Sequence, residues 1–137
     1  MAGATLLHKM RLKAGMQAGV VNAPLGYIEK LATPKGTSVK TALKAGPFDW
    51  LQIFVRSQSD LDALAGRLMS ALKPQGLLWL SFPKGTSKIQ TDLTRDRGWD
   101  ALKGLPLKWI NLISVDDTWS AFALRPYKPG EQQQSFR

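Results

Sequence analysis

Polar and charged side chains follow three predicted strands, and they are the residues best placed to bind a ligand. The three loops contain these candidate ligand-binding residues: Asn22, Gly26, Tyr27, Arg56, Ser57, Lys84, Ser87 and Lys88. Arginine and lysine beside hydroxyl groups and a helix N-terminus are typical of a site for phosphate or another anion. In an open α/β sheet, ligands bind beyond the carboxyl ends of the strands, where such loops meet. The alternative is that these residues are ordinary helix caps and solvated loop ends.

A second polar cluster is expected where Asp92, Arg95 and Asp117 approach one another. Asp92 and Asp96 are four residues apart, so on a helix they share one face and could bind a metal or act as an acid–base pair. We favour the alternative that they form surface ion pairs with neighbouring basic residues, each worth about 0–1 kcal/mol. Asp117 belongs to a predicted hairpin turn, and if it is buried it could pair with Arg95 across the end of the sheet.

Composition excludes several other kinds of site. The chain has no cysteine and a single histidine, His8, so we expect no metal site, no disulfide and no cysteine nucleophile. The sequence GTSK at residues 85–88 lacks the two glycines, with four residues between them, of a phosphate-binding loop. No apolar run approaches the roughly 18 residues of a membrane-spanning helix. No charged-then-apolar leader opens the sequence, so we expect a cytoplasmic protein that does not associate with membranes.

The net charge of +9 is concentrated in the first third of the chain. Residues 1–47 hold one acidic residue and seven basic ones: Lys9, Arg11, Lys13, Lys30, Lys35, Lys40 and Lys44. Such a surface attracts nucleic acid, phosphate groups or an acidic partner. The alternative is a soluble surface that happens to be basic, and we favour it because the basic residues form no contiguous run.

The order of predicted elements indicates a single α/β domain over residues 10–126, with flexible termini at 1–9 and 127–137. Dense apolar segments predict strands at residues 17–22, 48–55, 77–82, 108–115 and 119–125, and a weak edge strand at 37–43. Leu61, Leu64, Leu68 and Leu72 recur at helical spacing, and Lys73–Gly76 should end that helix. We also expect a short helix from Tyr27 and a longer helix over residues 91–103.

These elements predict a three-layer sandwich, in which helices cover both faces of a mostly parallel, reduced Rossmann-like sheet that ends in an antiparallel hairpin. The 137 residues suffice for one hydrophobic core, and 44% apolar content argues against disorder. The expected strand order is the first strand, the Phe48 strand, the Leu77 strand and then the hairpin. Asp116–Thr118 is short enough to make the last two strands antiparallel neighbours.

Particular segments resemble class I S-adenosylmethionine-dependent methyltransferases. FDWLQIF at residues 48–54 resembles their fourth strand, and LMSALKPQGLLWLSF at 68–82 resembles the next helix and fifth strand. The closing hairpin is similar to their last two strands. Over residues 10–126 the chain is also similar to a family of small bacterial proteins known as a domain of unknown function. The stretches PKGTSKIQTDLTRDRGWD and DDTWSA carry that similarity.

The cofactor half of the methyltransferase pattern is reduced in this sequence. The resemblance implies a glycine-rich loop after the first strand, where the backbone approaches the cofactor closely. Here that loop, residues 22–27, has only Gly26. The resemblance also implies an acidic residue after the second strand to bind ribose, yet no acidic residue lies between residues 30 and 48. The segment 30–47 is short for two strand–helix units.

Three functional hypotheses follow. The favoured one is a non-catalytic binding or assembly module with a degenerate cofactor site, which could form a homo-oligomer through an exposed sheet edge. The alternative is a methyltransferase-like enzyme with an atypical pocket for S-adenosylmethionine or another anionic ligand. The second alternative is a basic protein associated with nucleic acid.

Overall fold

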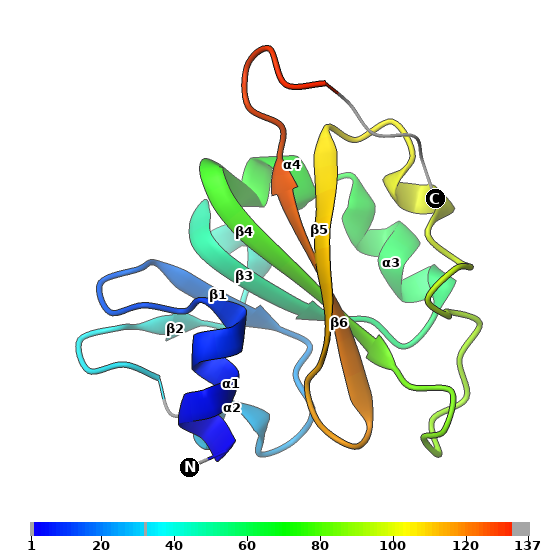
Figure 1. Ribbon diagram of the computed structural model, residues 1–137, viewed down its shortest axis with the longest axis horizontal. Coiled ribbons are helices and arrows are strands. Elements are labelled where there is room, and N and C mark those ends of the chain that lie inside the picture. The colour runs from blue at the N-terminus through cyan, green and yellow to red at the C-terminus, as the bar shows by residue number, and fades with distance from the viewer. Residues whose placement is uncertain (1, 32, 133–137) are drawn as a thin grey trace.

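The computed structural model describes residues 2–31 and 33–132, and its centre is a six-stranded sheet (Figure 1). The strand order is β2-β1-β3-β4-β6-β5, and the first four strands are parallel to one another. β6 runs antiparallel to β4, and β5 runs antiparallel to β6. The strand bounds are β1 Ala18–Val21, β2 Val39–Lys40, β3 Phe48–Phe54, β4 Leu72–Pro83, β5 Leu107–Ser114 and β6 Trp119–Pro126. The predicted mostly parallel sheet, its strand order and its closing hairpin are confirmed.

Helices lie on both faces of this sheet, because successive strand side chains point to opposite sides. Trp50 and Phe54 of β3 pack with the side of the sheet that carries α1 (Ala2–Met10) and α2 (Tyr27–Lys30). Leu51 and Ile53 pack with the opposite side. The helices of that side are α3 (Gln58–Ala65), α4 (Leu68–Ala71) and the 3₁₀ turn η2 (Asp100–Leu102), and a further 3₁₀ turn, η1, spans Leu43–Ala45. No helix of the described residues is long and apolar enough to cross a membrane.

The N-terminal segment is helical, where the sequence predicted a loose end over residues 1–9. Leu7 and Met10 of α1 are buried against the sheet. The carbonyl oxygen of Met10 accepts hydrogen bonds from the indole nitrogens of Trp50 at 2.7 Å and Trp79 at 2.9 Å. A buried indole N–H needs an acceptor, and the end of α1 supplies one for both tryptophans. At the other end, residues 127–132 form a turn, and 133–137 lie outside the described residues.

The helix predicted over residues 91–103 is wrong, because only η2 is helical there. The predicted inward-facing residues of this segment, Leu93, Trp99 and Leu102, are nevertheless buried. The hydroxyl of Thr94 accepts hydrogen bonds from the backbone N–H groups of residues 96 and 97. Gly98 has a φ of 98°. Side-chain-to-backbone bonds of this kind compete with helical hydrogen bonds, so an irregular loop replaces the helix.

Two other boundaries differ from the prediction. The leucine-rich helix is interrupted into α3 and α4, and Leu72 begins β4 instead of continuing the helix. The LKPQG segment is therefore the irregular start of a strand, with Leu72 paired to Phe48 across a shift in register. The predicted edge strand at 37–43 exists only as the two residues of β2.

Candidate functional site

The three loops predicted to bind a ligand all lie at the carboxyl ends of the parallel strands. β1, β3 and β4 are parallel, so their carboxyl ends lie together, and the turn between β5 and β6 joins them there. The loops nevertheless lie at separate positions beyond these strand ends, and the side chains of each loop make different contacts.

Asn22 and Gly26 lie in an open cleft beyond the end of β1. Both have positive φ angles, 61° for Asn22 and 82° for Gly26, so the chain turns sharply on either side of the fully exposed Leu25. The cleft has a volume of about 330 Å³. Its lining residues are Val20, Asn22, Ala23, Pro24, Leu25, Gly26, Ile28, Glu29 and Thr41. An amide, a carboxylate and a hydroxyl thus face a mainly apolar surface, which suits a ligand with hydroxyl groups and a flat apolar part.

Tyr27 points away from this opening and into the core. Its hydroxyl donates a 2.8 Å hydrogen bond to Oε1 of Gln52, whose Nε2 donates to the hydroxyl of Ser81 at 2.9 Å. Gln52 and Ser81 are completely buried in β3 and β4. Burial raises the pKa of Tyr27 to about 12, against a weaker lowering by the Gln52 bond. Tyr27 is therefore neutral at physiological pH and anchors the loop beneath the cleft.

Arg56 and Ser57 form the entry to α3. The guanidinium of Arg56 lies 5.6 Å from the ring centroid of Trp119, a cation–π contact. The Ser57 hydroxyl accepts a hydrogen bond from the backbone N–H of Asp60, as an N-cap does. The carboxylate of Asp60 in turn accepts from the backbone N–H of Arg56 at 2.9 Å. These contacts satisfy donors that an anionic ligand would otherwise use.

Asp92 completes that cap from a distant part of the sequence. Its carboxylate accepts a 2.8 Å hydrogen bond from the backbone N–H of Gln58, the first residue of α3. A negative charge at this end of a helix is favourable because the helix dipole is positive there. The structure therefore gives Asp92 a capping role, which differs from the predicted surface ion pair and from the predicted metal or acid–base site.

The other two members of the predicted polar cluster lie apart. Arg95 forms a 3.4 Å ion pair with the adjacent Asp96, and both side chains are largely exposed. Asp117 is exposed in the hairpin turn and, among the residues that the structure describes, forms no ion pair with Arg95. Within those same residues, no three carboxylate or imidazole groups gather as metal ligands would.

Lys84 and Ser87 lie against the hairpin turn. The ammonium of Lys84 donates a 2.6 Å hydrogen bond to the hydroxyl of Ser114, and the backbone oxygen of Ser114 accepts from Lys9 of α1 at 3.1 Å. The Ser87 hydroxyl donates to the backbone oxygen of Lys84. Lys88 is exposed in the same loop. These residues are separate from the cleft that Asn22 and Gly26 line.

Sequence reasoning missed two groups of residues. Glu29 and Thr41 are polar residues that line the cleft, and Gln52 and Ser81 form the buried hydrogen bonds beneath it. Glu29 is the only acidic residue among the first 47, which is a signal for a special position. Gln52 and Ser81 are the buried polar residues within the apolar parts of β3 and β4, and a buried polar side chain there needs a partner. Thr41 has no comparable signal, because it reaches the cleft through the fold of a segment with almost no regular structure.

Solved structures with a similar fold include S-adenosylmethionine-dependent methyltransferases. Ribosomal protein L11 methylase from Lactobacillus delbrueckii subsp. bulgaricus has a TM-score of 0.62 at 14% identity, over 93% of this chain and 77% of that protein. A TehB-like S-adenosylmethionine-dependent methyltransferase from Corynebacterium glutamicum has a TM-score of 0.63 at 12% identity, over 92% of this chain and 88% of its own. The fold is methyltransferase-like. No protein-family model matches the sequence, and no curated protein matches it.

The methyltransferase-like fold is reduced in the region that holds the cleft. β2 has two residues and α2 has four. The loop between β1 and α2 contains one glycine, Gly26, as the sequence indicates. A Cβ atom at Gly26 would meet no other atom within 4 Å, so the glycine is required by its backbone angle and not by crowding.

Proposed function

We propose that this protein binds a nucleoside ligand of the S-adenosylmethionine class in the cleft formed by residues 22–29. The observation that carries the proposal is Glu29, the only carboxylate of the first 47 residues, which lies in the cleft at the carboxyl end of β1. In nucleotide-binding α/β folds, a carboxylate commonly accepts hydrogen bonds from ribose hydroxyls. Here α2 supplies that group, although the pattern of the methyltransferase resemblance expects it after the second strand.

The rest of the cleft is compatible with the same ligand. Val20, Pro24 and Ile28 offer apolar surface for an adenine ring, and Asn22 offers an amide that both donates and accepts hydrogen bonds. The volume of about 330 Å³ lies at the lower end of the usual range for small-molecule sites. These features favour a site that can hold the cofactor, as the methyltransferase-like alternative requires, over the degenerate cofactor site of a non-catalytic binding or assembly module.

Thermal melts with S-adenosylhomocysteine test the proposal. Ligand at about one hundred times its dissociation constant stabilises the folded protein by about 2.7 kcal/mol, so Tm should rise by about 5–10 °C. Glu29→Gln should weaken binding about ten- to hundred-fold, because it removes a charge-assisted hydrogen bond. Asp62→Asn is the matched control, since Asp62 is exposed on α3, across the sheet from the cleft.

Two measurements show whether the ligand binds and, if it does, whether the protein transfers a methyl group. An unchanged Tm with millimolar S-adenosylhomocysteine, together with no heat of binding by calorimetry, would end the proposal. If the ligand binds, transfer of a labelled methyl group from S-adenosylmethionine to a cell extract distinguishes an enzyme from a binding module without catalysis.

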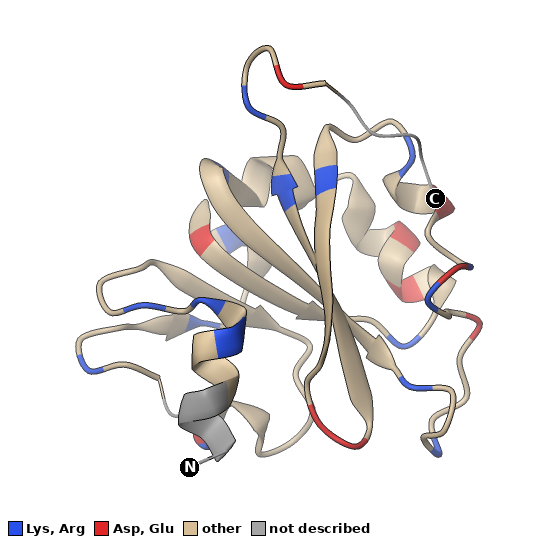
Figure 2. Cartoon of the chain, viewed as in Figure 1, with Lys and Arg blue, Asp and Glu red and all other residues tan. Residues whose placement is uncertain are grey.

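The distribution of charge favours nucleic-acid binding as a second candidate function. None of the seven basic residues of the first 47 forms an ion pair within residues 2–31 and 33–132. Figure 2 shows them around α1 and the β1–β2 side of the sheet, where few acidic positions lie. Binding of a fluorescent oligonucleotide should weaken steeply with salt, by a log–log slope of about −0.7 to −0.9 for each phosphate contacted. Absence of binding at low salt would remove this candidate.

A further inference from the structure

A small hollow lies between η1 and α4, on the side of the sheet that α3 covers. Its volume is about 220 Å³. The residues that line it are Leu43, Lys44, Gly46, Arg67, Ser70 and Ala71. This volume is below the roughly 300–1,000 Å³ of sites that hold a whole drug-sized ligand, so the hollow suits a single small chemical group.

The core holds the walls of this hollow in place. Leu43 and Ala71 are buried, and the chain passes from η1 into β3 through Gly46. A Cβ atom at Gly46 would lie 2.9 Å from Cδ2 of the buried Phe48 ring and 3.0 Å from the carbonyl oxygen of Ala71. Only glycine allows the end of η1 to approach α4 this closely. The polar side chains on the two sides of the hollow therefore extend from backbone that has little room to move.

The polar side chains of the hollow give it a positive charge. Lys44, Arg67 and Ser70 are all exposed to solvent. Among the residues that the structure describes, no carboxylate lines the hollow, and neither Lys44 nor Arg67 forms an ion pair. Asp49, the first acidic residue after Lys44 in the sequence, is bonded to Lys73 at 3.2 Å. The Ser70 hydroxyl donates to the backbone oxygen of Arg67, so the two cations give the hollow its preference for an anion.

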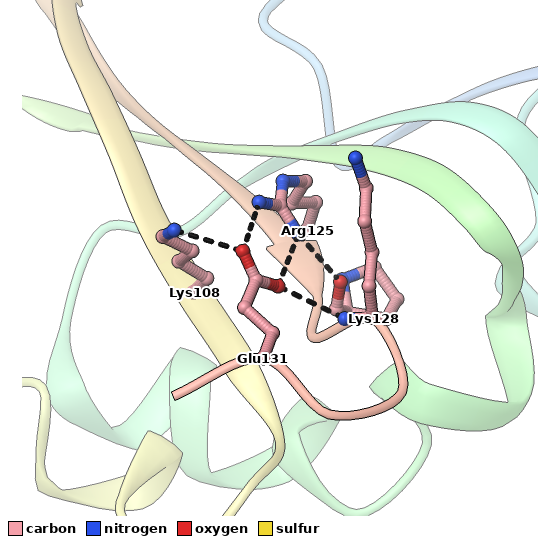
Figure 3. Close-up of polar contacts among 5 residues, drawn as sticks. Lys108, Arg125, Lys128 and Glu131 are labelled. Atoms are coloured by element: carbon pink, nitrogen blue, oxygen red, sulfur yellow. Dashed lines mark hydrogen bonds and ion pairs between the residues drawn. The ribbon is translucent and has the colours of Figure 1, made fainter. Parts of the chain in front are cut away.

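Another lysine and arginine of this chain show how such a pair acts on an anion (Figure 3). The carboxylate of Glu131 lies 2.9 Å from the ammonium of Lys108 and 2.7 Å from the guanidinium of Arg125. It also accepts a hydrogen bond from the backbone N–H of Lys128. The Arg125 hydrogen bonds, followed by the Lys128 N–H and the Lys108 hydrogen bond, hold the pKa of Glu131 well below its usual range. A lysine and an arginine around one site thus favour the charged form of an acidic group.

We propose that the hollow binds a dianionic phosphate group, either of a phosphate monoester or of free phosphate, between Lys44 and Arg67. A phosphate monoester carries about two negative charges at neutral pH, and these match the positive charges of the two side chains. The planar guanidinium of Arg67 can bind two phosphate oxygens at once, and the ammonium of Lys44 adds a compact charge. A carboxylate has a single charge and matches this pair less well.

The hollow is separate from the cleft that we propose for a nucleoside ligand. Gly46 comes just before the amino end of β3, whereas the cleft lies beyond the carboxyl end of β1. Because β1 and β3 are parallel, the hollow and the cleft lie at opposite ends of these strands. Failure of either binding proposal therefore leaves the other one standing.

Amide chemical shifts measured by NMR at about pH 8, where the monoester keeps its second charge, test the proposal. Inorganic phosphate and ribose 5-phosphate should each shift the amide signals of residues 44–46 and 67–71 until they saturate, with a Kd of about 1 mM. Sodium chloride of equal ionic strength should not shift them. Tighter binding of ribose 5-phosphate would assign the hollow to a phosphate monoester, and tighter binding of inorganic phosphate to the free ion.

Two substitutions remove the positive charges one at a time. Arg67→Gln and Lys44→Gln should each weaken phosphate binding about ten-fold, because each removes a charge-assisted contact. Both residues are exposed, and the Arg67 side chain forms no capping bond to α4, so the variants should fold as the wild type does. Arg97→Gln is the matched control. It removes the same charge from an exposed residue outside the lining of the hollow, and it should bind phosphate as tightly as the wild type.

Dimethyl phosphate separates a site for a monoester from a site for the phosphodiester backbone of nucleic acid. It carries a single negative charge, so it should bind about ten-fold more weakly than ribose 5-phosphate. Equal binding of the two compounds would overturn the proposal in favour of a nucleic-acid contact. The proposal is also wrong if phosphate shifts these amides no more than sodium chloride does, or if Arg67→Gln and Lys44→Gln bind phosphate as tightly as Arg97→Gln.

Discussion

The hydroxyl of Tyr27 and the side-chain amide of Gln52 form a buried hydrogen bond of 2.8 Å that joins α2 to β3, one of the two central strands of the sheet. The amide nitrogen of Gln52 continues the chain to Ser81 in β4. Each side-chain nitrogen and oxygen along this path has a hydrogen-bond partner, and the described residues contain no buried side-chain nitrogen or oxygen without one. These hydrogen bonds attach the loop that lines the cleft to β3 and β4, which lie in the core.

Tyr27→Phe should destabilise the protein by about 1–3 kcal/mol, because it leaves the buried Oε1 of Gln52 without a donor. Urea unfolding followed by tryptophan fluorescence measures the change. Gln52→Leu should cost less free energy in the Tyr27→Phe background than in the wild type, since the shared bond is already lost. Additive effects of the two substitutions would show that the bond contributes nothing.

The same tyrosine predicts a loss of stability at alkaline pH. Tyr27 ionises near pH 10 in the unfolded chain, but burial raises its pKa to about 12 in the folded protein. The folded state thus keeps a proton that the unfolded state loses, so this contribution to stability is complete below about pH 10 and disappears as pH rises to about 12. The decline amounts to about 2–3 kcal/mol.

Unfolding free energies measured in urea between about pH 9 and about pH 12 detect this decline, and Tyr27→Phe is the comparison. The variant should lose less stability over the same interval, because phenylalanine has no proton to lose. Parallel pH profiles of the two proteins would show that Tyr27 titrates normally.

The contact between Asp92 and the first turn of α3 predicts a more local effect. Asp92→Ala should destabilise the protein by about 0.5–2 kcal/mol, since it removes both a hydrogen bond to the Gln58 N–H and a favourable charge at the helix N-terminus. Asp62→Ala, in the same helix but exposed, should be neutral or slightly stabilising. Hydrogen exchange should quicken at the first turn of α3 in the Asp92 variant alone, and equal protection in both variants would contradict the capping role.

The sequence predicted the sheet well because its signals are local. The runs around Trp50 and Trp79 are apolar on both faces, which is typical of strands covered on both sides, and both strands occur as expected. The Leu61 and Leu64 spacing predicted the buried face of α3 for the same reason. Each of these patterns lies within a few residues of the chain.

The features that sequence reasoning missed depend on contacts between distant segments. Asp92 caps a helix that begins 34 residues earlier, so spacing within its own segment suggested a helix face instead. α1 is stable because Met10 accepts hydrogen bonds from tryptophans 40 and 69 residues away. Glu29 belongs to the short helix predicted from Tyr27, but no local pattern shows that this helix lies at the cleft. Tertiary context decides each case, and it overrides local propensity.

The packing of β1 provides a test that links the core to the cleft. An added Cβ atom at Gly19 would lie 2.8 Å from Cζ of Phe48, whose ring is completely buried. Gly19→Ala should therefore destabilise the protein by about 1–3 kcal/mol, because the ring has little room to move. Gly66→Ala is the control, since a Cβ atom there meets nothing within 4 Å and the residue has an αR conformation.

The control variant Gly66→Ala should stabilise the protein by about 0.4–1 kcal/mol, because alanine lowers the conformational entropy of the unfolded chain. Both unfolding free energies come from urea titration. Phe48→Leu in the Gly19→Ala background should recover part of the loss if the clash with the ring is its cause. Because β1 ends at the cleft, a displaced β1 should also weaken ligand binding in Gly19→Ala but not in Gly66→Ala. Equal stability of Gly19→Ala and the wild type would show that the Phe48 ring does not hold β1 in place.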